Sequence, residues 1–165
     1  MARVKPAELS AELDKVLSRM SIQSLKTSEK AIGATFTEIL RDVVIATPVD
    51  KGIAQANWFL TENSPSSQTS ESGNAQSRIN KIEKTFNKKV LGKTFFFVNN
   101  LPYISSLEYG LYPKSVKFGS YDKKTKSYKI KTDNGFSKQA PDGMLETNLA
   151  RFKSLLKSNF KRFKE

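Results

Sequence analysis

The sequence of 165 residues contains no cysteine and no histidine. The lack of cysteine excludes disulfides and thiolate metal sites, and it is compatible with a reducing compartment. The lack of histidine removes the usual catalytic base and a common zinc ligand, so serine–histidine and cysteine–histidine nucleophilic systems are excluded. Only chemistry based on carboxylates, lysine, tyrosine or carboxylate-bound magnesium remains open. We therefore expect a protein that is not an enzyme and has no catalytic residues, cofactor or metal site.

Long apolar runs are also missing. No stretch approaches the roughly 20 residues that a membrane-spanning helix needs, and the N-terminus turns polar too early for a signal peptide. We expect a soluble protein that is made in the cytosol and has no membrane partner. Its length fits a single domain, residues 1–165, with its own hydrophobic core.

Acidic residues are scarce in the last third of the chain. Residues 1–113 hold 14 basic and 11 acidic groups, whereas residues 114–165 hold 14 basic and 5 acidic groups. Most of the net charge of +12 therefore lies in the C-terminal third. This asymmetry favours a polyanionic neighbour, either nucleic acid or an acidic protein face, although a high charge also promotes solubility.

Apolar residues at spacings of three and four predict two helices in the N-terminal part of the chain. The first covers residues 6–20 and belongs to a helical arm, residues 1–24, in which residues 21–24 can interrupt the helix. The second begins near Ile32 and ends just before Pro48, because proline disfavours helical geometry in the residue that precedes it.

Two further helices are predicted later in the sequence. Residues 79–90 mark the first of them, and Gly92 ends it. Residues 145–163 form a basic amphipathic helix of about 20 residues. Its apolar stripe either packs against the protein's own sheet, or lies on anionic lipid or in the groove of a partner. Its last turn, which contains Phe160 and Phe163, is the part expected to reach a neighbouring subunit.

Strand signals lie mainly between the helices. Residues 53–62 and 93–100 are predicted to be strands, and the serine-rich residues 63–77 are predicted to be a mobile surface loop. Residues 102–110 begin with proline and end with glycine, which is typical of a short helix. Residues 114–131 predict a projecting β-hairpin. The fold class is therefore α+β, with a small, largely antiparallel sheet packed with helices.

The predicted hairpin is rich in lysine and aromatic residues. Its lysines either face DNA phosphates or an acidic protein, or they protect an exposed sheet edge from pairing with other chains. Phe118, Tyr121 and Tyr128 either stack on bases or form cross-strand pairs. Sequence-specific reading is not expected, because no arginine or amide set is placed to contact base edges. The lysines are Lys114, Lys117, Lys123, Lys124, Lys126, Lys129 and Lys131.

Three carboxylates raise the alternative of a magnesium-dependent nuclease. Glu38 and Asp42 stand four residues apart on one predicted helix, and Asp50 follows the end of that helix. Such carboxylates are typical magnesium ligands. Ordinary charges on a helix face, with Arg41 beside them, explain the same set equally well.

Three segments have a more specific pattern: TPVDKGIAQANW at residues 47–58, VNNLPYISSLEYG at 98–110 and SKQAPDGMLETNLARF at 137–152. In this order they resemble the neck or tail-completion proteins of tailed bacteriophages, over roughly residues 30–160. This sequence departs from the family at Lys51, where a small hydroxyl residue is common. The residues that carry the resemblance are Pro48, Val49, Asp50, Gly52, Asn57, Trp58, Asn100, Pro102, Tyr103, Glu108, Tyr109, Gly110, Gln139, Ala140, Pro141, Gly143 and Met144.

The resemblance implies a structural protein of the virion head–tail junction that assembles in the host cytoplasm. Copies of it would form a ring, most often a homohexamer, around the channel for double-stranded DNA. The ring would contact the head connector or stopper on one side and tail terminator or tail tube proteins on the other. The charge alone supports a different function, a nonspecific double-stranded-DNA-binding module. Candidate residues for the subunit interface are Tyr103, Glu108, Tyr109, Gly110, Gln139, Pro141, Phe160 and Phe163.

Overall fold

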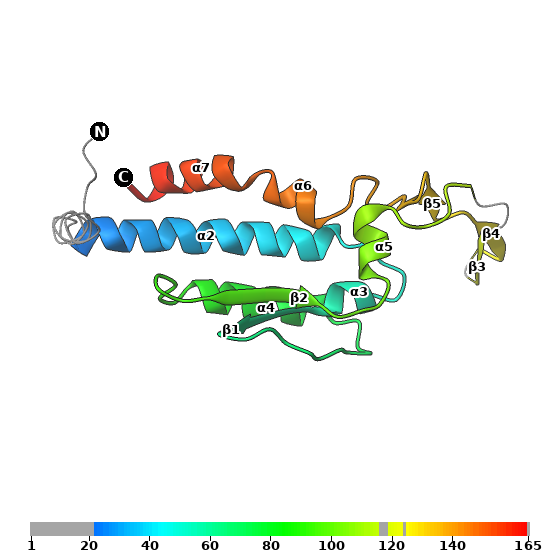
Figure 1. The fold of residues 1–165 in the computed structure, drawn as a ribbon, viewed down its shortest axis with the longest axis horizontal. Coiled ribbons are helices and arrows are strands. Elements are labelled where there is room, and N and C mark those ends of the chain that lie inside the picture. Colours follow the sequence, from blue (N-terminus) through cyan, green and yellow to red (C-terminus); the bar gives the residue numbers. More distant parts are fainter. Residues whose placement is uncertain (1–21, 116–118, 124, 165) are drawn as a thin grey trace, which may run out of the picture.

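The computed structural model describes residues 22–115, 119–123 and 125–164, and their helices and strands confirm the α+β class (Figure 1). None of the helices in these ranges is both long enough and apolar enough to cross a membrane. The elements in chain order are α2 (Ile22–Ala46), α3 (Ile53–Ala56), β1 (Trp58–Glu62), α4 (Ala75–Phe86), β2 (Phe95–Asn99), α5 (Ile104–Tyr109), β3 (Ser120–Asp122), β4 (Ser127–Lys129), β5 (Thr132–Asp133), β6 (Phe136–Ser137), α6 (Leu145–Leu149) and α7 (Phe152–Lys164).

Helix α2 is the central element of the fold. It lies between the α6–α7 segment on one side and α4 with the β1–β2 ribbon on the other (Figure 1). Ile39, Val43 and Val44 are almost completely buried along it. A helix that is covered on two sides needs apolar residues on more than one face, and α2 meets this requirement. It therefore joins the two outer layers into one body.

The ends of α2 differ from the prediction on one side only. Its predicted end before Pro48 is confirmed, since the helix stops at Ala46. Its start was predicted near Ile32, after an interruption of the preceding helix at residues 21–24, but α2 already begins at Ile22. The predicted helix over residues 6–20 lies outside the described residues.

The described strands form three separate two-stranded antiparallel ribbons rather than one sheet. In the longest ribbon, β1 and β2 pair from Trp58 opposite Asn99 to Glu62 opposite Phe95. A ribbon of two strands is marginally stable by itself in water, so it has to pack against another element. The β1–β2 ribbon packs against α4 and the core. By contrast, the β3–β4 hairpin projects from one end of the elongated body (Figure 1).

Aromatic rings connect the layers of the core. Trp58 on β1 stacks on Phe97 of β2 with ring centroids 4.7 Å apart. The ring of Phe36 on α2 lies 5.6 Å from that of Phe86 on α4 and 5.6 Å from that of Phe152 on α7. Such contacts add to the free energy gained by burying the rings. Phe36 therefore links α4 and α7 through α2.

Residues 53–62 are not one strand, as the sequence suggested. Residues 53–56 form the short helix α3, and only Trp58–Glu62 are extended. Gly52 precedes α3 with φ 75°, a conformation that glycine adopts without strain. The Asn57 side chain then donates to the carbonyl of Ile53 at 2.8 Å and closes the helical turn. The strand signal thus belongs to the aromatic half of the segment alone.

The predicted C-terminal helix is broken into α6 and α7. The Asn148 side chain donates to the carbonyl of Met144 at 2.7 Å, and the N–H of Arg151 donates to the carbonyl of Asn148 at 3.2 Å. The side-chain bond competes with the backbone ladder, and the three-residue backbone bond tightens the turn. The helix therefore ends at Leu149 and a second one begins at Phe152. Helix α4 also ends early, at Phe86 instead of Val90.

Candidate functional site

The turn after α2 is fixed by a buried hydrogen-bond chain. The Thr47 hydroxyl donates to the carbonyl of Val43 at 2.7 Å and accepts the indole N–H of Trp58 at 2.8 Å. Both side chains are buried, so satisfying these groups is necessary for stability. Pro48 is half-buried in the turn, and Gly52 has the positive φ described above. The predicted turn at Pro48 and Gly52 is confirmed.

Gln139 ties the third segment to this turn. Its side-chain oxygen accepts the N–H of Val49 at 2.8 Å, and its side-chain NH₂ donates to the carbonyl of Val49 at 2.9 Å. The amide thus pairs with one backbone residue as a neighbouring strand would. Gln139 is exposed to solvent, but the oxygen and the NH₂ group of its side chain both form hydrogen bonds within the chain. Pro141, two residues later, is exposed.

Glu108 ties the second segment to the start of α6. Its carboxylate accepts the backbone N–H groups of Met144, Leu145 and Glu146 at 3.0, 2.8 and 3.0 Å. A negative charge at a helix N-terminus satisfies N–H groups that have no partner within the helix. Glu108 is only 8% exposed. Glu108 thus has an internal partner for its charge, and the subunit contact expected for it stays a prediction.

Asparagine side chains connect the first two segments to each other and to the serine-rich loop. The Asn99 side chain donates to the carbonyl of Ala54 at 2.9 Å. The buried Asn57 side chain accepts the N–H of Ser70 and donates to its carbonyl, both at 2.7 Å. The Asn100 side chain donates to two further carbonyls of the serine-rich loop. The predicted loop is shorter than residues 63–77, because α4 already begins at Ala75. Its residues 63–74 contain no helix or strand and are tied to the body at several points.

A groove of about 560 Å³ opens between the turn after α2, α5 and the base of the hairpin. Partial burial raises the pKa of Tyr103, and the nearby Tyr112 adds a smaller electrostatic effect in the same direction. The shift favours the protonated form of the Tyr103 hydroxyl, which can donate a hydrogen bond. The residues that line the groove include Val49, Tyr103, Leu107, Tyr112, Ile130 and Lys131.

Exposed apolar side chains lie at the same end of the protein as this groove. Tyr109, the last residue of α5, is 56% exposed, and Leu111 just after it is 65% exposed. Gly110 between them has φ 63°, and the ring of Phe136 lies where a side chain at this position would project. Val49 and Ile130, which line the groove, are exposed as well. Of the predicted interface residues, Tyr103 and Tyr109 are thus at the surface, with Gly110 between two exposed neighbours.

A hairpin is confirmed within the predicted residues 114–131, but its paired strands β3 and β4 span only Ser120–Asp122 and Ser127–Lys129. Tyr121 and Tyr128 form a T-shaped cross-strand pair with centroids 5.2 Å apart, and both remain exposed. Lys129 pairs with Asp122 at 3.0 Å, and Lys131 pairs with Asp50 of the turn at 2.8 Å. The described lysines of the hairpin are all exposed: Lys114, Lys123, Lys126, Lys129 and Lys131. The predictions for Lys117, Phe118 and Lys124 fall outside the described residues.

The carboxylates considered for magnesium binding have other partners. Asp42 pairs with Arg41 at 3.3 Å and with Arg151 at 3.1 Å, so it links α2 to the start of α7. Glu38 accepts the side-chain N–H of Asn159 at 3.3 Å. Within residues 22–115, 119–123 and 125–164, no group of three or more acidic side chains is arranged to hold a metal ion.

The end of α7 contributes less exposed surface than the sequence suggested. Phe160 and Phe163 are both half-buried, and the guanidinium of Arg162 lies 5.3 Å from the centroid of the Phe163 ring. The buried Asn159 donates to the hydroxyl of Thr35 at 3.2 Å, across the α2–α7 contact. The sequence analysis missed Asn159 because a polar residue near an apolar stripe gives no signal of its partner.

The three segments that share the family resemblance therefore meet at one end of the body through Gln139, Glu108 and Asn99. No protein-family model, curated protein or solved structure matches this chain.

Proposed function

We propose that this chain is a structural component of the head–tail junction of a tailed-phage virion. In this proposal, copies of the chain form a ring, most simply a hexamer, around the DNA channel and join the tail to the head connector. The observation that carries the proposal is the convergence of the three resembling segments at one end of the body, through Gln139 and Glu108. Three segments far apart in sequence are most simply expected to resemble one family together when they form one structural unit.

The exposed apolar residues around this unit supply a surface for contact between copies. Tyr103 and Val49 line the groove, and Tyr109 and Leu111 extend the apolar surface beyond it. Aromatic residues are enriched in the buried centres of protein interfaces. The body is elongated and its two ends differ (Figure 1), which suits head-to-tail contacts that close into a ring.

The hairpin lysines fit a role at the edge of such a ring. Lys129 and Lys131 are held by Asp122 and Asp50, whereas Lys123 and Lys126 at the tip have no carboxylate partner among the described residues. Lysine acts as a point charge that binds phosphates or acidic side chains without demanding a fixed geometry. The tip would therefore contact passing DNA, or an acidic face of an adjoining head connector or tail protein, without sequence preference.

The proposal is tested by light scattering coupled to size-exclusion chromatography, combined with negative-stain imaging of the full chain. We expect closed rings. The double variant Tyr109→Ser and Leu111→Ser should shift the protein to monomers by removing apolar contact area, whereas Leu149→Ser on α6 should leave the rings intact. Leu149 is a matched control because it is also an exposed leucine. Rings that survive the double variant would contradict this interface.

The unpaired lysines also support a second function, a nonspecific duplex-binding module. The same chromatography separates the two. A persistent monomer that binds duplex DNA would support the module and contradict the ring.

A further inference from the structure

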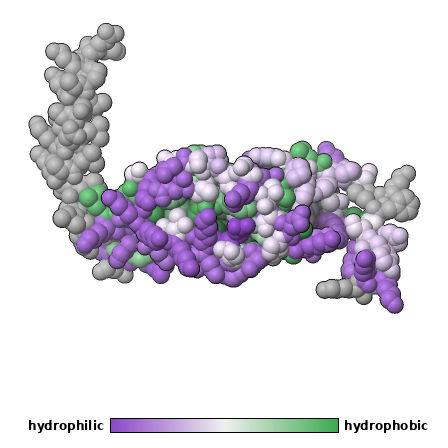
Figure 2. All heavy atoms as spheres, turned by 90° about the horizontal axis from the view of Figure 1, so that it is seen from below, coloured by the Kyte–Doolittle hydropathy of each residue, from purple (hydrophilic) through white to green (hydrophobic). Residues whose placement is uncertain are grey.

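Helix α4 carries a row of lysines on its outer face. Lys81 and Lys84 stand three residues apart on one side of α4, and Lys88 follows in the turn after the helix ends at Phe86. Ile82 and Phe86 are buried on the opposite side. Figure 2 views the molecule from the side on which α4 and the β1–β2 ribbon lie, and hydrophilic residues cover most of this face. We call Lys81, Lys84, Lys88 and Lys89 the α4 lysine face.

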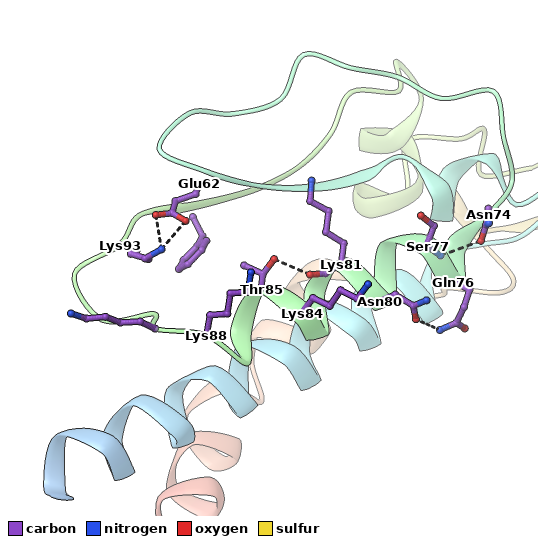
Figure 3. A pocket seen from close by; sticks show the side chains of 12 residues that line it. Glu62, Asn74, Gln76, Ser77, Asn80, Lys81, Lys84, Thr85, Lys88 and Lys93 are labelled. Carbon is purple, nitrogen blue, oxygen red and sulfur yellow. Dashed lines mark hydrogen bonds and ion pairs between the residues drawn. The ribbon is translucent and has the colours of Figure 1, made fainter. Parts of the chain in front are cut away.

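The α4 lysine face borders a hollow of about 600 Å³. Figure 3 shows the lysine side chains around it, together with an ion pair between Lys93 and Glu62. This pair measures 2.9 Å and engages the one carboxylate among the described residues that line the hollow. The remaining polar lining includes Ser77 and Asn80. The hollow is thus positively charged and rich in hydrogen-bonding groups.

The charges of this face are not balanced within the described part of the chain. None of Lys81, Lys84, Lys88 and Lys89 forms an ion pair with a carboxylate there. Lys81 and Lys84 are like charges three residues apart on α4, so they repel each other and destabilise the helix. An anionic partner would remove this repulsion, and a partner with several charges at regular intervals would do so along the whole face.

The lining indicates which anion fits. The hydroxyl of Ser77 and the side-chain NH₂ of Asn80 can donate to phosphate oxygens between the lysines. Phe95, the aromatic residue of the lining, is half-buried and packs against Phe86 with centroids 5.1 Å apart. Single-strand binding relies on successive aromatic faces that stack on bases, and the described lining offers this one partly buried ring alone. The chemistry therefore favours a continuous phosphate backbone.

We infer that the α4 lysine face binds the phosphate backbone of double-stranded DNA without reading its sequence. The inference rests on the proposed function, because it assigns to α4 the surface that meets the DNA inside the ring. It adds a second basic surface, separate from the hairpin and on a different element of the fold (Figure 1).

The test uses the full chain with all four lysines of the face changed to glutamine. Binding to a labelled duplex of about 20 base pairs is measured by fluorescence anisotropy between about 50 and 200 mM salt. Each phosphate contact contributes about 0.9 to the slope of log affinity against log salt, so the slope should decrease by about 3 to 4 in the variant. In the unchanged protein, the factor that these four lysines contribute to the binding constant for duplex DNA should fall about 100-fold between the lowest and the highest salt concentration.

Two further variants serve as controls. Changing Lys153, Lys157, Lys161 and Lys164 on α7 to glutamine removes the same charge from another exposed helix face and should alter the slope by less than about 1. Changing the α4 lysines to arginine keeps the charge and should retain the slope. Equal slopes for the two glutamine variants would overturn the inference. The inference would also be overturned if the unchanged protein bound poly-glutamate more tightly than duplex DNA and the α4 glutamine variant lost this binding. Such a result would identify an acidic protein as the partner.

Failure of the inference can be distinguished from failure of the proposed function. Rings whose DNA affinity does not depend on the α4 lysines would overturn the inference alone. A monomer that loses DNA binding in the α4 variant would contradict the ring and leave the inference standing.

Discussion

The body of the protein and its hairpin use polar residues in opposite ways. In the body, Glu108, Asn57 and Asn159 are buried, and each has hydrogen-bond partners within the chain. In the hairpin, Tyr128 is 73% exposed and the described lysines point their charge to solvent. Buried polar groups stabilise a fold only when they are satisfied, whereas exposed ones remain available to a partner. The comparison assigns stability to the buried polar groups of the body and recognition to exposed polar groups such as those of the hairpin.

The strongest way to break this comparison is to remove the cap of α6. Glu108→Ala leaves three backbone N–H groups without a partner, one of them on the buried Met144. We expect a loss of roughly 3–5 kcal/mol in the free energy of unfolding, measured by urea denaturation, because each unsatisfied group costs about 1–3 kcal/mol. Glu71→Ala in the exposed loop should change it by less than about 0.5 kcal/mol. Equal midpoints for the two variants would show that Glu108 does not cap α6.

A smaller effect is expected where two helices approach closely. A Cβ atom on Gly33 of α2 would lie 2.5 Å from the backbone oxygen of Phe86 on α4. Gly33→Ala gains about 1 kcal/mol in helix propensity, but overpacking costs typically 1–3 kcal/mol, so we expect a net loss of roughly 1 kcal/mol. Thermal unfolding measures it, with Lys30→Ala on the exposed side of α2 as the control. An increase in stability for Gly33→Ala would mean that the helices can separate without cost.

The smallest effect is expected in the hairpin. Tyr128→Ala removes the cross-strand pair with Tyr121, and we expect global stability to change by less than about 0.5 kcal/mol. Phe97→Ala, which removes the ring stacked on Trp58 in the body, should cost about 3 kcal/mol. Urea denaturation compares the two. A loss above about 1 kcal/mol for Tyr128→Ala would show that the hairpin contributes to the stability of the body.

The sequence predicted the elements whose signal is local. Apolar spacing located α2 and α4, and turn chemistry located α5 and the hairpin. The break before α7 was not predictable, because it depends on how Asn148 bonds to Met144 within the folded chain. A periodic apolar stripe continues across this break and gives no sign of it.

The candidate surfaces were predictable only in part. Tyr103 and Tyr109 were identified from the resemblance and are exposed. The partners of Glu108 lie 36 to 38 residues away in sequence, so its role as a cap left no local signal. The α4 lysine face had a local signal in the spacing of its lysines, but residues 1–113 hold 14 basic and 11 acidic groups, so the net charge of this part hides it.

The central claim, that copies of this chain dock into a ring, is tested most directly by distances between copies. The sequence contains no cysteine, so Lys157→Cys on the exposed face of α7 gives a single site for a spin label. In a closed hexamer, pulsed electron paramagnetic resonance should yield discrete distances in the ratio of about 1 to 1.7 to 2. A sample in which no distance between labels is detected would contradict the claim.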